Sequence, residues 1–164
     1  MINKLIDDMN NALKANCYLA ALSIALMLPD ICGKAAYPKK LVGERYIKWF
    51  DENIGAYEQD PDKTCLPHLN GALVYSLRNY FLHQGTPTID KVKQNIDCFQ
   101  LIIEKQNEFD MYADESWYMG ENERGYQVNI RRLCLVIGQT AKWYYEQNKE
   151  KFNFFHYSII DKRT

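Results

Sequence analysis

An arginine, an amide and a histidine gather within residues 78–83, which read Arg-Asn-Tyr-Phe-Leu-His. Arg78 carries a planar guanidinium that is always charged and matches the oxygens of a phosphate. His83 can accept or donate a proton, and Asn79 lies four residues before it, where an amide on a helix can orient the imidazole. Binding a phosphate and moving a proton are the two tasks of a ribonuclease that needs no metal ion. Arg78, Asn79 and His83 are therefore the candidate catalytic residues.

This hexapeptide ends an apolar-periodic segment that predicts a helix over about 67–85, with Gly85 at the left-handed position after the helix. One face holds the residues expected to join the core, which are Leu66, Leu69, Leu73, Leu77, Tyr80 and Phe81. The opposite face holds Tyr75 and Leu82 beside Arg78. An apolar pair among polar groups predicts a second buried surface, which we expect to be a homodimer contact. We expect Arg78 and Tyr75 to contact the substrate.

The spacing of Arg78 and His83 predicts how the site is assembled. On an α-helix, residues five apart are separated by roughly 140° around the axis and about 7.5 Å along it. Such a pair does not easily converge on one atom within a single chain. Two copies of the helix packed antiparallel would bring two arginines and two histidines around one cleft. The motif is therefore expected to be half of a composite site at a dimer interface.

The remaining segments predict the elements that position this helix. Residues 2–28 form one long amphipathic helix ended by Pro29 and Gly33, and further helices cover 43–59 and 128–149. The inner side of the second of these helices holds Tyr46, Trp49, Phe50 and Ile54. Residues 99–103 and 109–118 alternate enough to form an antiparallel hairpin, followed by a polar loop over 120–125, and 152–160 predict a strand that could join it.

The expected fold is mainly α, a bundle of about four main helices with a small antiparallel β appendage. A chain of 164 residues with 47% hydrophobic residues is long enough for one domain with its own core. That domain is expected to cover 1–164, with the helical part and the motif in 1–86. Residues 87–164 would supply the hairpin, the last long helix and the C-terminal strand.

Composition limits the partners. The formal net charge of -1 gives no global cationic field, so any contact with RNA must be local. Five scattered cysteines without a CxxC pair predict reduced thiols. Cys65 and His68 have the spacing of two metal ligands, but the sequence shows no second pair to complete a site, so we expect no metal ion and no cofactor. The apolar run 17–28 is too short to span a bilayer and follows a mixed-charge start. We therefore expect a soluble, cytoplasmic protein that does not act at a membrane.

The hexapeptide resembles the signature of the HEPN superfamily: an arginine, a polar residue that is often asparagine, three variable residues and a histidine. HEPN proteins are helical bundles that commonly dimerise with their motifs facing each other. Many are metal-independent endoribonucleases of toxin, abortive-infection and CRISPR-associated systems. The resemblance covers the motif and broadly residues 1–85, whereas the segment from Pro87 onward departs from a minimal HEPN bundle.

The resemblance implies a role for each residue of the motif. His83 would act as general base or acid on the ribose 2′-hydroxyl or the leaving 5′-oxygen, and Arg78 would stabilise charge on the phosphate. Asn79 would hold the histidine or contact the phosphate. The products would be a 2′,3′-cyclic phosphate and a 5′-hydroxyl. An antitoxin or a protein of the nucleotidyltransferase type would be the expected partner.

Other interpretations stay open at this point. A HEPN-like bundle can also be a non-catalytic module that binds a partner protein or a small ligand. The motif could instead be a solvated helix end, with His83 capping carbonyls. Asp30 fits a turn cap better than a catalytic role, and Arg45 fits a solvated helix face as well as a cleft. Five aromatic residues could stack on bases but are more simply core or interface residues: Trp117, Tyr118, Trp143, Tyr144 and Tyr145.

Overall fold

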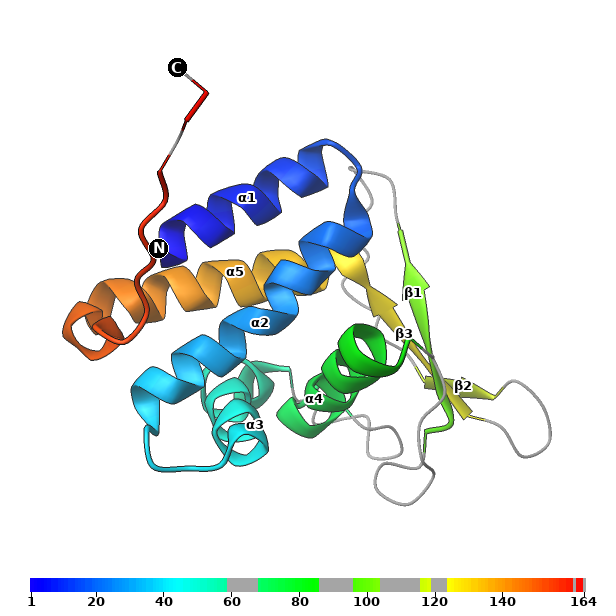
Figure 1. Ribbon diagram of the computed structural model, residues 1–164. Coiled ribbons are helices and arrows are strands. Elements are labelled where there is room, and N and C mark those ends of the chain that lie inside the picture. The colour runs from blue at the N-terminus through cyan, green and yellow to red at the C-terminus, as the bar shows by residue number, and fades with distance from the viewer. Residues whose placement is uncertain (59–67, 86–95, 104–115, 119–123, 161, 164) are drawn as a thin grey trace.

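The computed structural model describes residues 1–58, 68–85, 96–103, 116–118, 124–160 and 162–163. Within these residues the chain is mainly helical, with a small sheet beside the helices (Figure 1). The α-helices are α1 (Ile2–Lys14), α2 (Tyr18–Ala36), α3 (Val42–Asn53), α4 (Gly71–Asn79) and α5 (Ile130–Gln147). The shorter helices are η1 (Gly55–Tyr57), η2 (Tyr80–Gln84) and η3 (Lys149–Phe152). The strands are β1 (Cys98–Ile102), β2 (Ser116–Tyr118) and β3 (Arg124–Asn129).

The single helix predicted over 2–28 is wrong, because the chain turns between α1 and α2. Asn16 takes a left-handed backbone conformation with φ of 58°. Its N–H donates to the Leu13 carbonyl at 3.2 Å, and the Cys17 N–H donates to the Ala12 carbonyl at 2.8 Å. These two bonds form a Schellman motif, which asparagine can close because its short side chain tolerates the left-handed region. The helix count in the described residues thus rises from about four to five.

Helix α2 runs through the middle of the bundle and packs against α1, α3 and α5 (Figure 1). Its predicted end at Pro29 is wrong, since the helix continues to Ala36 with the proline buried inside it. Among the described helices, α2 is long and apolar enough to cross a membrane by length and composition, and half of that window is buried within the protein. Burial against three neighbouring helices is the environment of a core helix.

Helix α3 confirms the predicted buried face. Tyr46, Trp49 and Phe50 have no exposed surface, and Ile54 is 2% exposed. Large aromatic side chains at these steps bury the inner side of α3 against α2. The helix itself ends at Asn53, earlier than predicted, and the chain continues as the short turn η1.

Helix α4, which carries the candidate motif, begins at Gly71 and lies close against α3. Asn70 caps it, because its side chain accepts a hydrogen bond from the Leu73 N–H at 3.0 Å. A Cβ atom at Gly71 would lie 2.5 Å from the Ile47 carbonyl oxygen, so only glycine allows this approach. Pro67, the predicted start, lies outside the described residues. Leu73 and Leu77 are buried as predicted, which fixes the inner face of α4.

The sheet differs from the predicted antiparallel hairpin. Its order is β1-β3-β2, with β1 parallel to β3 and β2 antiparallel to it. The central strand β3 occupies residues assigned to a polar loop and to the start of the last helix. Of the second predicted strand, only residues 116–118 lie within the described part of the chain. Asn129 ends β3 and caps α5 by accepting from the Arg132 N–H at 3.0 Å.

The predicted C-terminal strand over 152–160 is also wrong, since none of these residues, all of them described, is in a strand. The chain after α5 makes η3, and Phe152 packs its ring against Tyr144 and Tyr145 at 6.2 and 5.1 Å between centroids. Lys34 of α2 then lies over the Phe154 ring at 5.1 Å and Phe155 packs against the core, and only the end of the segment runs away from the helices (Figure 1). The alternating apolar residues that predicted a strand therefore belong in part to an aromatic cluster, in which Phe152 packs against the last turn of α5.

Candidate functional site

The end of α4 is a π-helical turn, η2, and this geometry decides how the motif is arranged. The Gly85 N–H donates to the Tyr80 carbonyl at 2.8 Å, a bond between residues five apart. Gly85 has φ of 64°, so the prediction of a left-handed glycine there is confirmed. A π-turn closes bonds from residue i to residue i+5 instead of i+4, and such turns occur often at functional sites.

The wider turn brings Arg78 and His83 together within one chain. The Arg78 Nη1 and the His83 Nε2 are 3.2 Å apart. The prediction that Arg78 and His83 do not easily converge within a single chain is therefore wrong, because it assumed a regular α-helix through residue 83. A guanidinium can only donate, so a hydrogen bond at this contact requires the Nε2 to accept and the ring proton to lie on Nδ1. His83 is exposed, with that accepting nitrogen beside Arg78.

Arg78 has three further neighbours. Its Nη1 donates to the Asn79 Oδ1 at 2.9 Å, and its Nη2 lies 3.6 Å from the Asp30 Oδ2. Its guanidinium carbon lies 5.7 Å from the centre of the Tyr75 ring, a cation–π distance. Asn79 was predicted to orient His83, but its side-chain oxygen accepts from Arg78 instead. The arginine is thus the centre of the motif, and both Asn79 and His83 contact it.

Asp30 joins Arg78 to a second arginine, Arg45. The Asp30 Oδ1 accepts from the Arg45 Nη2 at 2.9 Å and from its Nε at 3.2 Å. The side chains of Asp30, Arg45 and Arg78 are 24%, 15% and 16% exposed, so they form a partly buried charged cluster. Two guanidinium groups and one carboxylate leave one net positive charge, enough to attract one phosphate.

Sequence reasoning missed the role of Asp30, which comes from α2, and of Arg45, which comes from the first turn of α3. A signal for Asp30 was nevertheless present. It is the only acidic residue in the apolar helix α2, and a carboxylate that is carried into a core needs a cation beside it. The partner could not be named from the sequence, because three helices must first pack together.

Tyr75 and Leu82, the apolar pair that predicted a dimer contact, lie half-buried against the core of their own chain. The Tyr75 ring packs on Tyr46 at 5.2 Å between centroids. Tyr46 is fully buried and donates to the Leu26 carbonyl at 3.2 Å, and its burial raises its pKa well above the ordinary value for tyrosine. The observation that motivated a homodimer is therefore explained within the chain, while the homodimer itself stays a prediction.

The other residues noted in the sequence do not join the charged cluster. His68 and His156 are exposed, and Cys65 lies outside the described residues. Cys134 is buried, and this burial raises its pKa to about 12, so it remains a thiol. Across the described ranges, no group of three or more His, Cys, Asp or Glu side chains is placed to hold a metal ion.

A scan against models of protein families, a search of curated proteins and a search of solved structures each found no significant match to this chain.

Proposed function

We propose that this protein is a HEPN-like endoribonuclease that cleaves RNA without a metal ion, with Arg78 and His83 of one chain as its catalytic pair. The observation that carries the proposal is the 3.2 Å contact between the Arg78 Nη1 and the His83 Nε2. This contact supports the proposal because a guanidinium can bind a phosphate and an imidazole nitrogen can accept a proton. The proposal extends to a HEPN-type bundle, whose mainly helical character the described elements share.

The proposed reaction begins when Arg78 binds the scissile phosphate and releases the His83 Nε2. That nitrogen accepts the proton of the ribose 2′-hydroxyl, and the 2′-oxygen attacks the phosphorus. The bond from phosphorus to the 5′-oxygen breaks, and the protonated ring returns its proton to that oxygen. The products are a 2′,3′-cyclic phosphate and a 5′-hydroxyl, and no water is consumed. Arg78 stabilises the charge that develops on the phosphate.

The residues around the pair have supporting roles in this proposal. Asp30 fixes the Arg78 side chain, and Arg45 supplies the second positive charge of the charged cluster. Tyr75 stacks on the guanidinium and limits its rotation. Asn79 occupies one donor of Arg78, so a phosphate would compete with its side-chain oxygen as well as with His83.

The test is RNA cleavage in EDTA by wild type, His83→Ala and His156→Ala, the last a matched control because His156 is exposed and lies outside the motif. We expect His83→Ala to lower cleavage by about 10²-fold or more, and His156→Ala to cleave like wild type with 2′,3′-cyclic ends. Cleavage by His83→Ala at the wild-type rate would contradict the proposal. Equal absence of cleavage in folded wild type and variant would favour a non-catalytic module.

A second experiment asks whether one chain or two supply the site. Arg78→Ala and His83→Ala are mixed, refolded together and assayed. A site within one chain stays inactive in every mixture. Recovery of cleavage would show a composite site at a homodimer interface, with an arginine from one copy and a histidine from the other, and would contradict the single-chain pair. Light scattering on the wild type gives the oligomeric state.

We further propose that the protein acts in the cytoplasm as a toxin or phage-defence nuclease, held inactive by an antitoxin or a nucleotidyltransferase-type partner. A metal-free nuclease with one accessible site would need such control in a cell that is full of RNA. Induced expression of wild type is expected to arrest growth, and His83→Ala is expected not to. Equal growth of both strains at equal protein level would argue against this role.

A further inference from the structure

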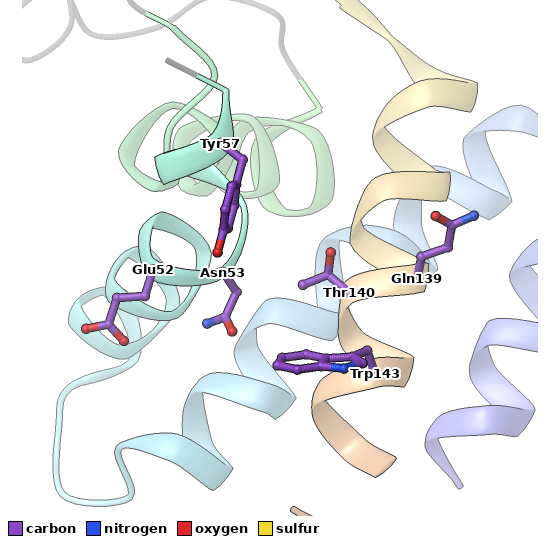
Figure 2. Close-up of a pocket in the computed structure, with 6 residues that line it drawn as sticks. All are labelled: Glu52, Asn53, Tyr57, Gln139, Thr140 and Trp143. Atoms are coloured by element: carbon purple, nitrogen blue, oxygen red, sulfur yellow. The ribbon is translucent and has the colours of Figure 1, made fainter. Parts of the chain in front are cut away.

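A cavity of about 390 Å³ lies at the opposite end of α3 from the charged cluster, between α3 with η1 on one side and α5 on the other. We call it the aromatic pocket. Six residues line it: Glu52, Asn53, Tyr57, Gln139, Thr140 and Trp143 (Figure 2). Its volume lies within the range of roughly 300–1,000 Å³ that is usual for small-molecule sites.

Two large aromatic side chains reach this pocket from opposite elements. Tyr57 is 83% exposed and Trp143 is 59% exposed, high values for rings of this size. Figure 2 shows Tyr57 pointing from η1 and Trp143 pointing from α5 into the same gap. Exposed aromatic faces beside a cavity are suited to stack on a flat ring, and such stacking needs no particular sequence or charge.

The polar groups of the pocket can form hydrogen bonds with the edge of a flat ring. The Asn53 Nδ2 donates to the Trp49 carbonyl at 2.8 Å. Because a carbonyl can only accept, this bond fixes which side-chain atom of Asn53 is the nitrogen and leaves its Oδ1 as an acceptor. Gln139 and Thr140 add groups that both donate and accept. The pocket thus offers an acceptor to a ligand that carries N–H groups on its edge.

The charges around the pocket disfavour a phosphate. Glu52 is the only ionisable side chain apart from the Tyr57 phenol among the six, and no lining residue is a cation. The carboxylate of Glu52 accepts from the Tyr37 hydroxyl and pairs with Lys48 at 3.1 Å, and the bond from Tyr37 is the main cause of its lowered pKa. Glu52 is therefore an ionised group whose charge Lys48 balances, and the lining residues offer no cation of their own to a phosphate.

Contacts outside the pocket hold its two sides in place. Arg132 of α5 forms an ion pair with Glu58, the residue that follows η1, and both side chains are largely buried. Deeper in the fold, Trp49 of α3 meets Tyr144 of α5 edge to face at 5.7 Å between ring centroids. The backbone positions of Tyr57 and Trp143 are thus set by the fold and do not depend on a ligand.

We propose that the aromatic pocket binds a nucleobase that carries an exocyclic amino group, with adenine as the type case. The base would stack on the Trp143 ring beside Tyr57 and donate its amino group to the Asn53 Oδ1. The base of a free nucleoside and a base within an RNA strand present the same chemistry to the pocket. Asn53 and Arg45 are eight residues apart on α3, about 12 Å along the axis, so one strand could reach both regions.

The experiment is an NMR titration with adenosine that follows the side-chain amide signals of Asn53 and Gln139 in every variant, and also the indole N–H signal of Trp143, assigned with Trp143→Phe, where that residue is present. Wild type is expected to show a saturable shift. Trp143→Ala is expected to bind about tenfold more weakly or worse, and Tyr157→Ala, a 71% exposed aromatic outside the pocket, is expected to bind like wild type. No saturable shift, or equal affinity in Trp143→Ala, would overturn the proposal.

Two further ligands test which groups of the pocket recognise the base. Purine riboside lacks the amino group and carries no N–H on that edge, so it is expected to bind several-fold more weakly than adenosine in wild type but equally in Asn53→Leu. Adenosine monophosphate is expected to bind no more tightly than adenosine, because no lining residue is a cation. Equal affinity of wild type for purine riboside and adenosine would overturn the role of Asn53, and much tighter binding of the monophosphate would overturn a site without a cation.

A 2′-O-methylated oligoadenylate, which cannot be cleaved through its 2′-oxygen, distinguishes the two sources of the base. Tighter binding of this strand than of adenosine, together with a shift at His83, assigns an RNA strand. Equal binding without a shift at His83 assigns a free nucleoside. Both outcomes support the pocket, and neither depends on cleavage by Arg78 and His83. A protein that binds adenosine but does not cleave RNA would support the pocket and contradict the proposed nuclease.

Discussion

The two ends of α3 support two regions of opposite character. At its first turn, Arg45 joins Asp30 and Arg78 in the charged cluster, where each side chain is at most 24% exposed and has an opposite charge beside it. At its last turn, Asn53 borders the aromatic pocket, where Tyr57 and Trp143 are 83% and 59% exposed. Partly buried charges need their partners in order to fold, whereas exposed rings do not.

Because of this difference, a substitution should affect stability and function together at one end of α3 and separately at the other. In the charged cluster the groups that would bind a phosphate are the groups that hold α2, α3 and α4 together, so a change there alters both properties. In the aromatic pocket the groups that would bind a base contribute little to the fold, so binding can be removed alone.

The largest effect is expected from Gly71→Ala, which would separate α4 from α3. The added Cβ would meet the backbone carbonyl of Ile47 at 2.5 Å, and a backbone atom cannot rotate away. We expect a loss of about 2–3 kcal/mol in the free energy of unfolding, measured by urea denaturation. RNA cleavage should fall with it, while adenosine affinity should change little, because α4 supplies no lining residue.

Gly138→Ala is the matched control for this change. Its Cβ would also meet an atom at 2.5 Å, but that atom is the terminal methyl of Met9, which can move. We expect a clearly smaller loss of stability than for Gly71→Ala, and unchanged cleavage. Equal losses in both variants would mean that the approach of α4 to α3 is not as rigid as the backbone contact implies.

Asp30→Asn should have the next largest effect, since it removes the carboxylate between two arginines. The pair is partly buried, so we expect a loss of about 1–2 kcal/mol in the free energy of unfolding and slower RNA cleavage through a less well-held Arg78. Glu44→Gln is the control, because its pair with Lys40 is 3.7 Å long and about half exposed. Wild-type cleavage by Asp30→Asn would remove Asp30 from the site.

Much of the fold was predictable, because apolar side chains at helical spacing are buried for the same physical reason wherever they occur. The inner faces of α3 and α4 follow that rule at Trp49, Phe50, Leu73 and Leu77. The split between α1 and α2 was not predicted, since apolar spacing continues across it. A single asparagine, Asn16, makes the turn through its left-handed backbone, and asparagine is also common in helices and loops.

The sequence named the residues of the proposed site but not their arrangement. The types and order of Arg78 and His83 identify the motif, and their contact depends on one extra residue in the last turn of the helix. The spacing of apolar residues cannot predict a π-turn, because it is the same whether the last backbone hydrogen bond joins residues four or five apart. Here that bond joins Gly85 to Tyr80. Trp143 was named as a residue that could stack on bases, and the pocket around it needed the packing of α3 on α5.

A smaller effect is expected from Gly85→Ala, which tests the π-turn itself. Gly85 has φ of 64° and nothing within 4 Å of the added Cβ, so the cost is only that of a left-handed alanine. We expect a loss of about 1 kcal/mol in the free energy of unfolding and a modest loss of cleavage. Gly85→Asn should lose less, because asparagine tolerates this conformation. Greater damage by asparagine than by alanine would contradict the backbone explanation.

The smallest effect on stability is expected from Trp143→Ala, and it tests the other side of the contrast. With 59% of the ring exposed, its removal should change the free energy of unfolding by no more than about 0.5 kcal/mol, measured by urea denaturation. Adenosine binding should nevertheless be lost, and RNA cleavage of a dinucleotide too short to span both regions should be unchanged. A large loss of stability would mean that the ring supports the fold, and the pocket would then resemble the charged cluster instead of differing from it.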